Sequence, residues 1–247
     1  DERPGHLRFS GIRLMTTNSY ETRRSEIEHY FDRTAAEAWS KLTSDAPVSR
    51  IRATVRAGRE QMRQTLLDWL PADMRGLRLL DAGCGTGALA IEAARQGAEV
   101  VAVDLSPKLV ELARERMPAD VGPGRVDFRA GDTFDPALGD FDHVVAMDSL
   151  IHYEVKDMLE VIRRLAPRIR GSFLFTFAPK TPLLAMMHAV GQFFPRGDRS
   201  PAIVPVRAAR LQRLIANAED LAAWRVGRTQ RIDSGFYTSQ ALELQHL

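Results

Sequence analysis

A chain of 247 residues with 45% hydrophobic content is long enough to bury the core of one enzyme-sized domain. Its formal net charge of +2 is too small to indicate a nucleic-acid-binding protein, and no run approaches the ~20 apolar residues that a membrane-spanning helix needs. Cys84 is the only cysteine, so the composition argues against a disulfide-stabilised secreted domain and favours a reducing, cytoplasmic location.

The chain before residue 72 is expected to be helical. Residues 1–14 show no clear period and are left outside the expected fold, as an upstream or vector-derived extension. Residues 15–71 are expected to form a helical segment that closes over a substrate. Its second helix should run from about residue 49 to 70 and end near Pro71. One face of its first helix is predicted to carry Ile27, Tyr30, Phe31 and Thr34.

Apolar residues from Leu77 to Leu80 run directly into a turn that contains Gly83, Gly85 and Gly87, and helical spacing resumes at Ala88. A strand, a glycine turn and a helix in this order are typical of a nucleotide-like cofactor site, because glycine lets a ligand approach the backbone closely. The same letters also satisfy the G-x-G-x-x-A fingerprint of a nicotinamide dinucleotide site. The glycine spacing alone therefore leaves two cofactor classes open.

Acidic residues at four successive strand ends separate these two classes. Asp81, Asp104, Asp132 and Asp148 each follow a run of mainly apolar residues. A pyrophosphate beside Asp81 would be repelled, whereas S-adenosylmethionine (SAM) carries a sulfonium and an ammonium and no phosphate. Helix capping can account for one or two of the acids but not for Asp81. The series therefore favours SAM.

Three motifs carry a family resemblance: D-A-G-C-G-T-G from Asp81, V-D-L-S from Val103 and G-D from Gly131. Together they resemble the class I, Rossmann-like SAM-dependent methyltransferases. The resemblance implies that the glycine turn holds the methionyl part of SAM, that the acid after the second strand binds the ribose, and that the acid after the third lies near the adenine. The cofactor-binding residues expected on this basis are Asp81, Gly83, Cys84, Gly85, Gly87, Asp104, Leu105, Asp132, Thr133 and Asp148.

The same resemblance implies an α/β fold with a mostly parallel sheet and an antiparallel edge hairpin. Residues 72–247 would form the SAM-binding domain, interrupted after the fifth strand by a helical insertion over residues 181–206. This apolar insertion either covers the sheet or forms a substrate lid, in which Met187 would contact the substrate. The seven strands are expected near residues 78–81, 99–103, 126–130, 143–147, 171–177, 224–232 and 236–244.

A stripe of arginines at helical spacing, Arg52, Arg56, Arg59 and Arg63, is by itself explained as a solvated helix face. It occurs together with Tyr30-Phe31-Asp32, with Leu150-Ile151-His152-Tyr153 and with Phe236-Tyr237. Over residues 20–244 this pattern resembles the magnesium-protoporphyrin IX O-methyltransferase family of bacteriochlorophyll biosynthesis. The resemblance implies that SAM methylates one propionate of a magnesium porphyrin and leaves S-adenosylhomocysteine (SAH).

We expect His152 and Tyr30 to orient the reacting carboxylate. Candidates for neutralising the porphyrin acids are Arg50, Arg52 and Arg56, and Tyr153 is a further candidate substrate contact. The histidines are scattered without metal-ligand spacing, so magnesium is expected only as part of the substrate. The resemblance also implies a transient contact with the magnesium-inserting enzyme and at most a peripheral contact with the inner membrane.

Two other functions stay open at this point. One is a SAM-dependent methyltransferase of a smaller acid, amine or phenol, because the segment from Asp148 to Tyr153 alone does not distinguish these acceptors. The other is a regulator or carrier that binds SAM or a porphyrin without turnover, against which the intact acid series argues.

Overall fold

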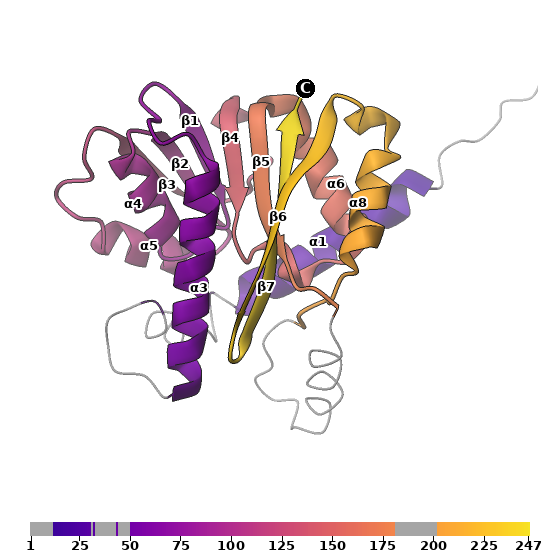
Figure 1. Cartoon of the computed structure of the whole chain (residues 1–247), viewed down its shortest axis with the longest axis horizontal. Helices are drawn as coiled ribbons and strands as arrows, with labels where there is room; N and C mark the ends of the chain where they lie inside the picture. Colours follow the sequence, from indigo (N-terminus) through magenta and orange to yellow (C-terminus); the bar gives the residue numbers. More distant parts are fainter. Residues whose placement is uncertain (1–11, 31, 33–42, 44–49, 181–201) are drawn as a thin grey trace, which may run out of the picture.

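The computed structural model describes residues 12–30, 32, 43, 50–180 and 202–247. Seven strands form one sheet in the order β3-β2-β1-β4-β5-β7-β6, with helices on both faces (Figure 1). The strands are β1 (Arg78–Ala82), β2 (Glu99–Asp104), β3 (Arg125–Ala130), β4 (Phe141–Ala146), β5 (Ile169–Phe177), β6 (Trp224–Ser234) and β7 (Tyr237–His246). The α-helices are α1 (Ile12–Tyr30), α3 (Arg50–Trp69), α4 (Ala88–Arg95), α5 (Pro107–Glu115), α6 (Val155–Leu165) and α8 (Ala208–Ala216). Short 3-10 helices are η2 (Pro136–Leu138), η3 (Leu150–His152), η4 (Ala166–Arg168) and η5 (Glu219–Leu221).

The sheet confirms the predicted Rossmann-like architecture. β1 pairs in parallel with both β2 and β4, so the strand order reverses at β1, where ligands bind in doubly wound sheets. β7 lies antiparallel between β5 and β6 and forms the edge hairpin with β6. All seven predicted strands are present, and their ends differ from the predicted ones by no more than two residues.

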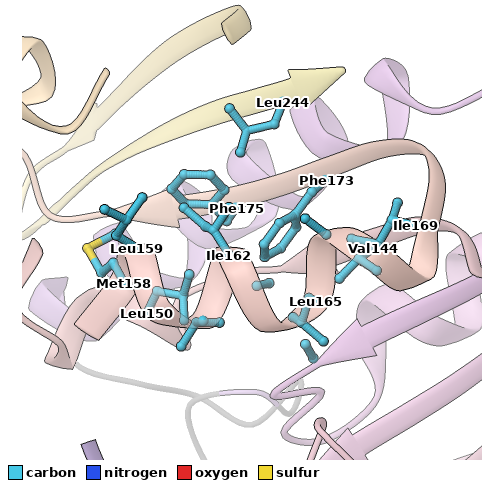
Figure 2. Packing of buried hydrophobic residues seen from close by; sticks show 14 of the residues in the cluster. Val144, Leu150, Met158, Leu159, Ile162, Leu165, Ile169, Phe173, Phe175 and Leu244 are labelled. Carbon is cyan, nitrogen blue, oxygen red and sulfur yellow. The ribbon is translucent and has the colours of Figure 1, made fainter. Parts of the chain in front are cut away.

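In the central strands, alternating side chains contribute to two separate hydrophobic cores. In β4, Val144 belongs to the core beneath α6, whereas Val145 belongs to the core beneath α3 and α4. In β5, Phe173 and Phe175 point to the α6 side and Leu174 to the other. Figure 2 shows the α6 side, where side chains of α6 and η3 pack against β4, β5 and β7. Burial on both faces is the expected environment of a parallel sheet.

The N-terminal helices depart from the predicted boundaries in one respect. α1 begins at Ile12, so three residues that the sequence pattern left outside the fold belong to this helix. Ile27 is buried, but Phe31 and Thr34, predicted for the same face, lie outside the described residues. α3 matches its predicted range to within one residue at each end.

The insertion after β5 is described only from residue 202, so Met187 lies outside the described residues. The division of the chain into a helical appendage, a cofactor domain and an insertion stays a prediction. None of the helices in the described ranges is long and apolar enough to cross a membrane.

Candidate active site

The glycine turn between β1 and α4 has the geometry that the motif predicts. The backbone N–H groups of Gly83 and Cys84 donate to Val103 O at 2.8 and 3.0 Å, which fastens the turn to the end of β2. Gly83 has φ of 85°, and a Cβ added there would lie 2.5 Å from the Cβ of Ser149. Only glycine allows the turn to approach the β4 end this closely.

Two buried carboxylates differ in how they are satisfied. Asp104 accepts the backbone N–H of Gly85 at 2.8 Å and that of Ser106 at 2.9 Å. Asp81 is 2% exposed, and its Oδ2 has no hydrogen-bond partner among the described residues. Burial, and then the charge of Asp104, raise the pKa of Asp81 to about 7. A buried acceptor beside a second carboxylate fits a ligand that carries positive charge.

A cavity of about 560 Å³ opens beside this turn, within the usual size range of small-molecule sites. The predicted cofactor residues that line it are Asp81, Gly83, Cys84, Gly85, Asp104, Leu105, Asp132, Thr133 and Asp148. The predicted catalytic and substrate residues that line it are Tyr30, Arg52, Arg56, His152 and Tyr153. Gly87 begins α4 with φ of 79° behind the turn and does not line the cavity. Arg50 is exposed at the first residue of α3 and does not line it either.

His152 lies on η3, immediately after the β4 end, where it is 5% exposed. Its Nδ1 is 3.4 Å from Ala202 O, so the described end of the insertion contacts the imidazole. The neighbouring Tyr153 stacks on Tyr20 of α1 with ring centroids 5.3 Å apart and an interplanar angle of 19°. Tyr153 thus places the β4 end against the N-terminal helix, while His152 meets the described end of the insertion.

Burial keeps both stacked tyrosines neutral. It raises the pKa of Tyr20 to about 12, with the charge of Asp132 as the second cause, and it raises the pKa of Tyr153 well above its ordinary value. Both phenols therefore act as hydrogen-bonding groups and not as bases near neutral pH. Sequence reasoning missed Tyr20, although Tyr20 and Ile27 are seven residues apart and share one helical face.

A second residue of α1, Arg24, was also missed. Its Nη1 lies 3.3 Å from Oδ2 of Asp132, the acid expected near the adenine. The other oxygen of Asp132 accepts the backbone N–H of Phe134 at 2.9 Å. Because Arg24 and Asp132 are far apart in the chain, no local signal could have paired them.

The remaining predictions concern reactivity and metals. Cys84 is 9% exposed, and burial raises the pKa of its thiol well above the ordinary value. This agrees with a packing role, since the thiolate and not the thiol is the nucleophile. Across the described ranges, no group of three or more His, Cys, Asp or Glu could hold a metal ion.

Two family models match the chain. One is described as "Magnesium-protoporphyrin IX methyltransferase C-terminus" and matches residues 146–246. The other is described as "Methyltransferase domain" and matches residues 79–170. The first range contains η3, α6 and the edge hairpin, and the second contains the glycine turn and the acid-bearing strand ends.

Relatives match over nearly the whole chain. A magnesium-protoporphyrin O-methyltransferase of Rhodobacter capsulatus is 46% identical over 227 residues, which covers 92% of this chain and 98% of the relative. The enzyme of the same name from Synechocystis sp. is 28% identical over 229 residues, with the same coverage of 92% and 98%. A crystal structure of magnesium protoporphyrin IX methyltransferase from Synechocystis PCC 6803 with bound SAH matches with a TM-score of 0.78 at 26% identity, over 90% of this chain and 99% of that chain. This chain therefore belongs to the magnesium-protoporphyrin O-methyltransferase family.

Proposed function

We propose that this chain transfers the methyl group of SAM to one propionate carboxylate of magnesium protoporphyrin IX and gives the monomethyl ester during bacteriochlorophyll biosynthesis. The observation that carries the proposal is the 46% identity to the Rhodobacter capsulatus enzyme along 98% of that enzyme's length. The cavity supports it, because the acids beside the glycine turn, here called its cofactor end, suit a cationic cofactor, and the arginines of α3 in its lining suit an anionic substrate.

The residues of the cofactor end fit SAM, which supplies an electrophilic methyl group when bound. Asp81 would accept the ammonium of the methionyl part, because its Oδ2 is buried without a partner among the described residues. Asp104, at the end of β2, would accept the ribose hydroxyls. Leu105 and Thr133 line the same cavity and would flank the adenine beside Asp132.

The acceptor needs orientation more than deprotonation. A propionate has an ordinary pKa close to that of glutamate, about 4.3, and is ionised at neutral pH. Holding its oxygen in line with the methyl carbon and the sulfur is worth roughly 7–11 kcal/mol in well-oriented reactions. The reaction also neutralises charge, since carboxylate and sulfonium become ester and thioether. A cavity that excludes water would favour that change.

Four side chains would provide this orientation. His152 lies at the β4 end beside the glycine turn and lines the cavity. Tyr30, the last residue of α1, lines it from the N-terminal side. Both would donate a hydrogen bond to the reacting carboxylate. Arg52 and Arg56 would pair with the porphyrin carboxylates, because guanidinium matches carboxylate geometry with two parallel N–H donors.

We also propose a cytoplasmic location with at most peripheral contact at the inner membrane. A transient contact with the magnesium-inserting enzyme is part of this proposal. The physical support is the substrate itself: a large apolar macrocycle is poorly soluble, so direct transfer between two proteins, or along a lipid surface, avoids its release into water.

The deciding experiment incubates the purified protein with magnesium protoporphyrin IX and methyl-labelled SAM. We expect label in a porphyrin monomethyl ester and stoichiometric SAH. The matched control is magnesium protoporphyrin dimethyl ester, in which both carboxylates are blocked, and it should take no label. Label transferred to small acids, amines or phenols and not to the porphyrin would contradict the proposed substrate. Tight SAM binding without transfer to any acceptor would indicate a carrier or regulator.

A further inference from the structure

Asp148 follows β4 in a backbone conformation that is rare for a residue with a side chain. Its φ is 53°, and it is the single non-glycine residue with positive φ among those the structure describes. The left-handed region costs roughly 1–2 kcal/mol for most side chains, and Asp and Asn tolerate it best. Strain of this kind persists only where the surroundings hold the residue in place.

Four donors from three elements hold the Asp148 carboxylate, which is 5% exposed. Arg59 of α3 pairs with it through Nη1. The hydroxyl of Tyr237 on β7 donates to Oδ1 at 3.0 Å. Ser239 and Thr176 donate to the same oxygen at 3.4 and 3.2 Å, and Thr176 also accepts the Asp148 backbone N–H at 2.7 Å. In contrast to Asp81, this carboxylate is satisfied without a ligand.

Gly58, the residue before Arg59, brings α3 directly onto Tyr237. A Cβ on Gly58 would lie 2.4 Å from Cδ1 of the tyrosine ring, so only glycine permits this approach. Glycine inside a helix is about 1 kcal/mol less favourable than alanine, and the close contact offsets that loss. Further along the helix, Ser234 Oγ donates to Thr54 O at 3.0 Å, so α3 is also fastened to the end of the edge hairpin.

The anchored Arg59 shares a helical face with other arginines of α3, two of which are proposed to meet the substrate. Arg52, Arg56 and Arg59 are spaced by four and three residues, which places their side chains one above another along α3. All three line the cavity. A rotation of α3 about its axis would therefore move all three together. The residue that fixes Arg59 also fixes the direction of Arg52 and Arg56.

We propose that Asp148 is a positioning residue and not a cofactor ligand. With Arg59 and Tyr237 it holds α3 against the end of β4, so that Arg52 and Arg56 face the substrate carboxylates. This inference rests on the proposed function, because it takes the substrate to be a porphyrin with two propionates. It replaces the expectation from the sequence, in which Asp148 belongs with the acids that bind SAM.

The test compares Asp148→Asn, Arg59→Met and their double variant with the wild type. Asparagine is chosen because it tolerates the left-handed backbone. We expect each single variant to raise the porphyrin KM about tenfold, as for the loss of one charge-assisted hydrogen bond, and to change the SAM dissociation constant by less than about twofold. The porphyrin KM of the double variant should not exceed that of the single variant with the higher KM, because both substitutions remove the same contact. Hydrogen exchange over residues 50–58 should accelerate in all three.

Two further variants decide between the alternatives. Tyr237→Phe removes one hydroxyl, so it should raise the porphyrin KM and accelerate hydrogen exchange in α3 by less than Asp148→Asn does. This variant keeps the test decisive if Asp148→Asn does not fold. The control is Arg63→Met, because Arg63 lies on the same helical face but pairs with Glu60 and not with Asp148. If Arg63→Met raised the porphyrin KM as much as Arg59→Met does, total charge, and not the anchor, would set substrate affinity. Two results for the Asp148 and Arg59 variants would overturn the proposal. One is SAM binding weakened about tenfold with an unchanged porphyrin KM, and the other is no change in either quantity. The exchange measurement needs no substrate, so failure of the proposed function would be seen separately, as a wild type that does not methylate the porphyrin.

Discussion

The glycine turn and the arginine helix α3 form two walls of one cavity, but different kinds of contact position them. The turn is held by backbone bonds to the neighbouring strand, from Gly83 and Cys84 to Val103, and its acids are brought together by the parallel pairing of β1 and β2. α3 is held by side-chain contacts between residues 89 positions apart in the chain, Arg59 with Asp148. Cofactor recognition is therefore a property of the strand order, whereas substrate recognition depends on a few long-range side-chain contacts.

The largest expected effect tests whether the β4 end acts on the transition state. His152→Ala should lower kcat about a hundredfold or more and leave SAM affinity nearly unchanged, because the carboxylate stays ionised but loses its alignment. Steady-state kinetics with isothermal titration of SAM checks both quantities. Wild-type turnover in a folded variant would return His152 to a packing role.

The pH profile separates orientation from general-base catalysis by His152. If the imidazole only orients the carboxylate, wild-type activity at saturating SAM should rise through the acid range as the propionate ionises and then stay level up to about pH 9. If it acts as a general base, activity should rise through the imidazole titration, and that rise should vanish in His152→Ala.

The next effect concerns the cofactor wall alone. Asp104→Ala should weaken SAM binding by roughly 1.5–3 kcal/mol, the contribution typical of a hydrogen bond to a charged group. The porphyrin dissociation constant, measured by fluorescence quenching, should change little, because Asp104 accepts the backbone N–H groups of Gly85 and Ser106 beside the cofactor turn. Unchanged SAM affinity in a folded protein would remove Asp104 from the cofactor site.

The sequence predicts the two walls of the cavity unequally well. The seven strands, the turn and the acids were predictable, because hydrophobic period and glycine spacing are local signals. Tyr20, Arg24 and the anchoring of Asp148 were not. Arg24 meets Asp132 and Arg59 meets Asp148 only after the chain has folded, and one sequence carries no signal for pairs at such separations.

A stability measurement sharpens the account of α3. Gly58→Ala should improve helix propensity by about 1 kcal/mol, but its Cβ would meet the Tyr237 ring at 2.4 Å. Overpacking of this kind typically costs about 1–3 kcal/mol, so we expect a net loss in the free energy of unfolding, measured by urea denaturation. The control is Ala57→Gly, which should be destabilising through propensity alone. A stabilised Gly58→Ala protein would mean that α3 does not depend on this contact.

The smallest expected effect tests the cofactor wall through Asp81, whose pKa is raised to about 7 by burial and by Asp104. A ligand ammonium favours the ionised form, so SAM affinity should fall as the pH drops through about 7, approaching tenfold per unit below it. Asp81→Asn should bind SAM more weakly above pH 7 and show a flatter profile in isothermal titration.

The Asp81 carboxyl also makes the stability of the folded protein depend on pH. Because its pKa in the folded protein lies above the ordinary value of 3.8, its contribution to stability is fully present below that ordinary value and is lost as the pH rises through about 7. The ligand-free wild type should therefore lose stability relative to Asp81→Asn over this range, and saturating SAM should reverse the difference. If the two ligand-free proteins kept a constant difference in thermal stability from pH 4 to 8, the carboxyl would titrate normally. Asp81 could then no longer be described as the buried acceptor that makes this end of the cavity selective for a cation.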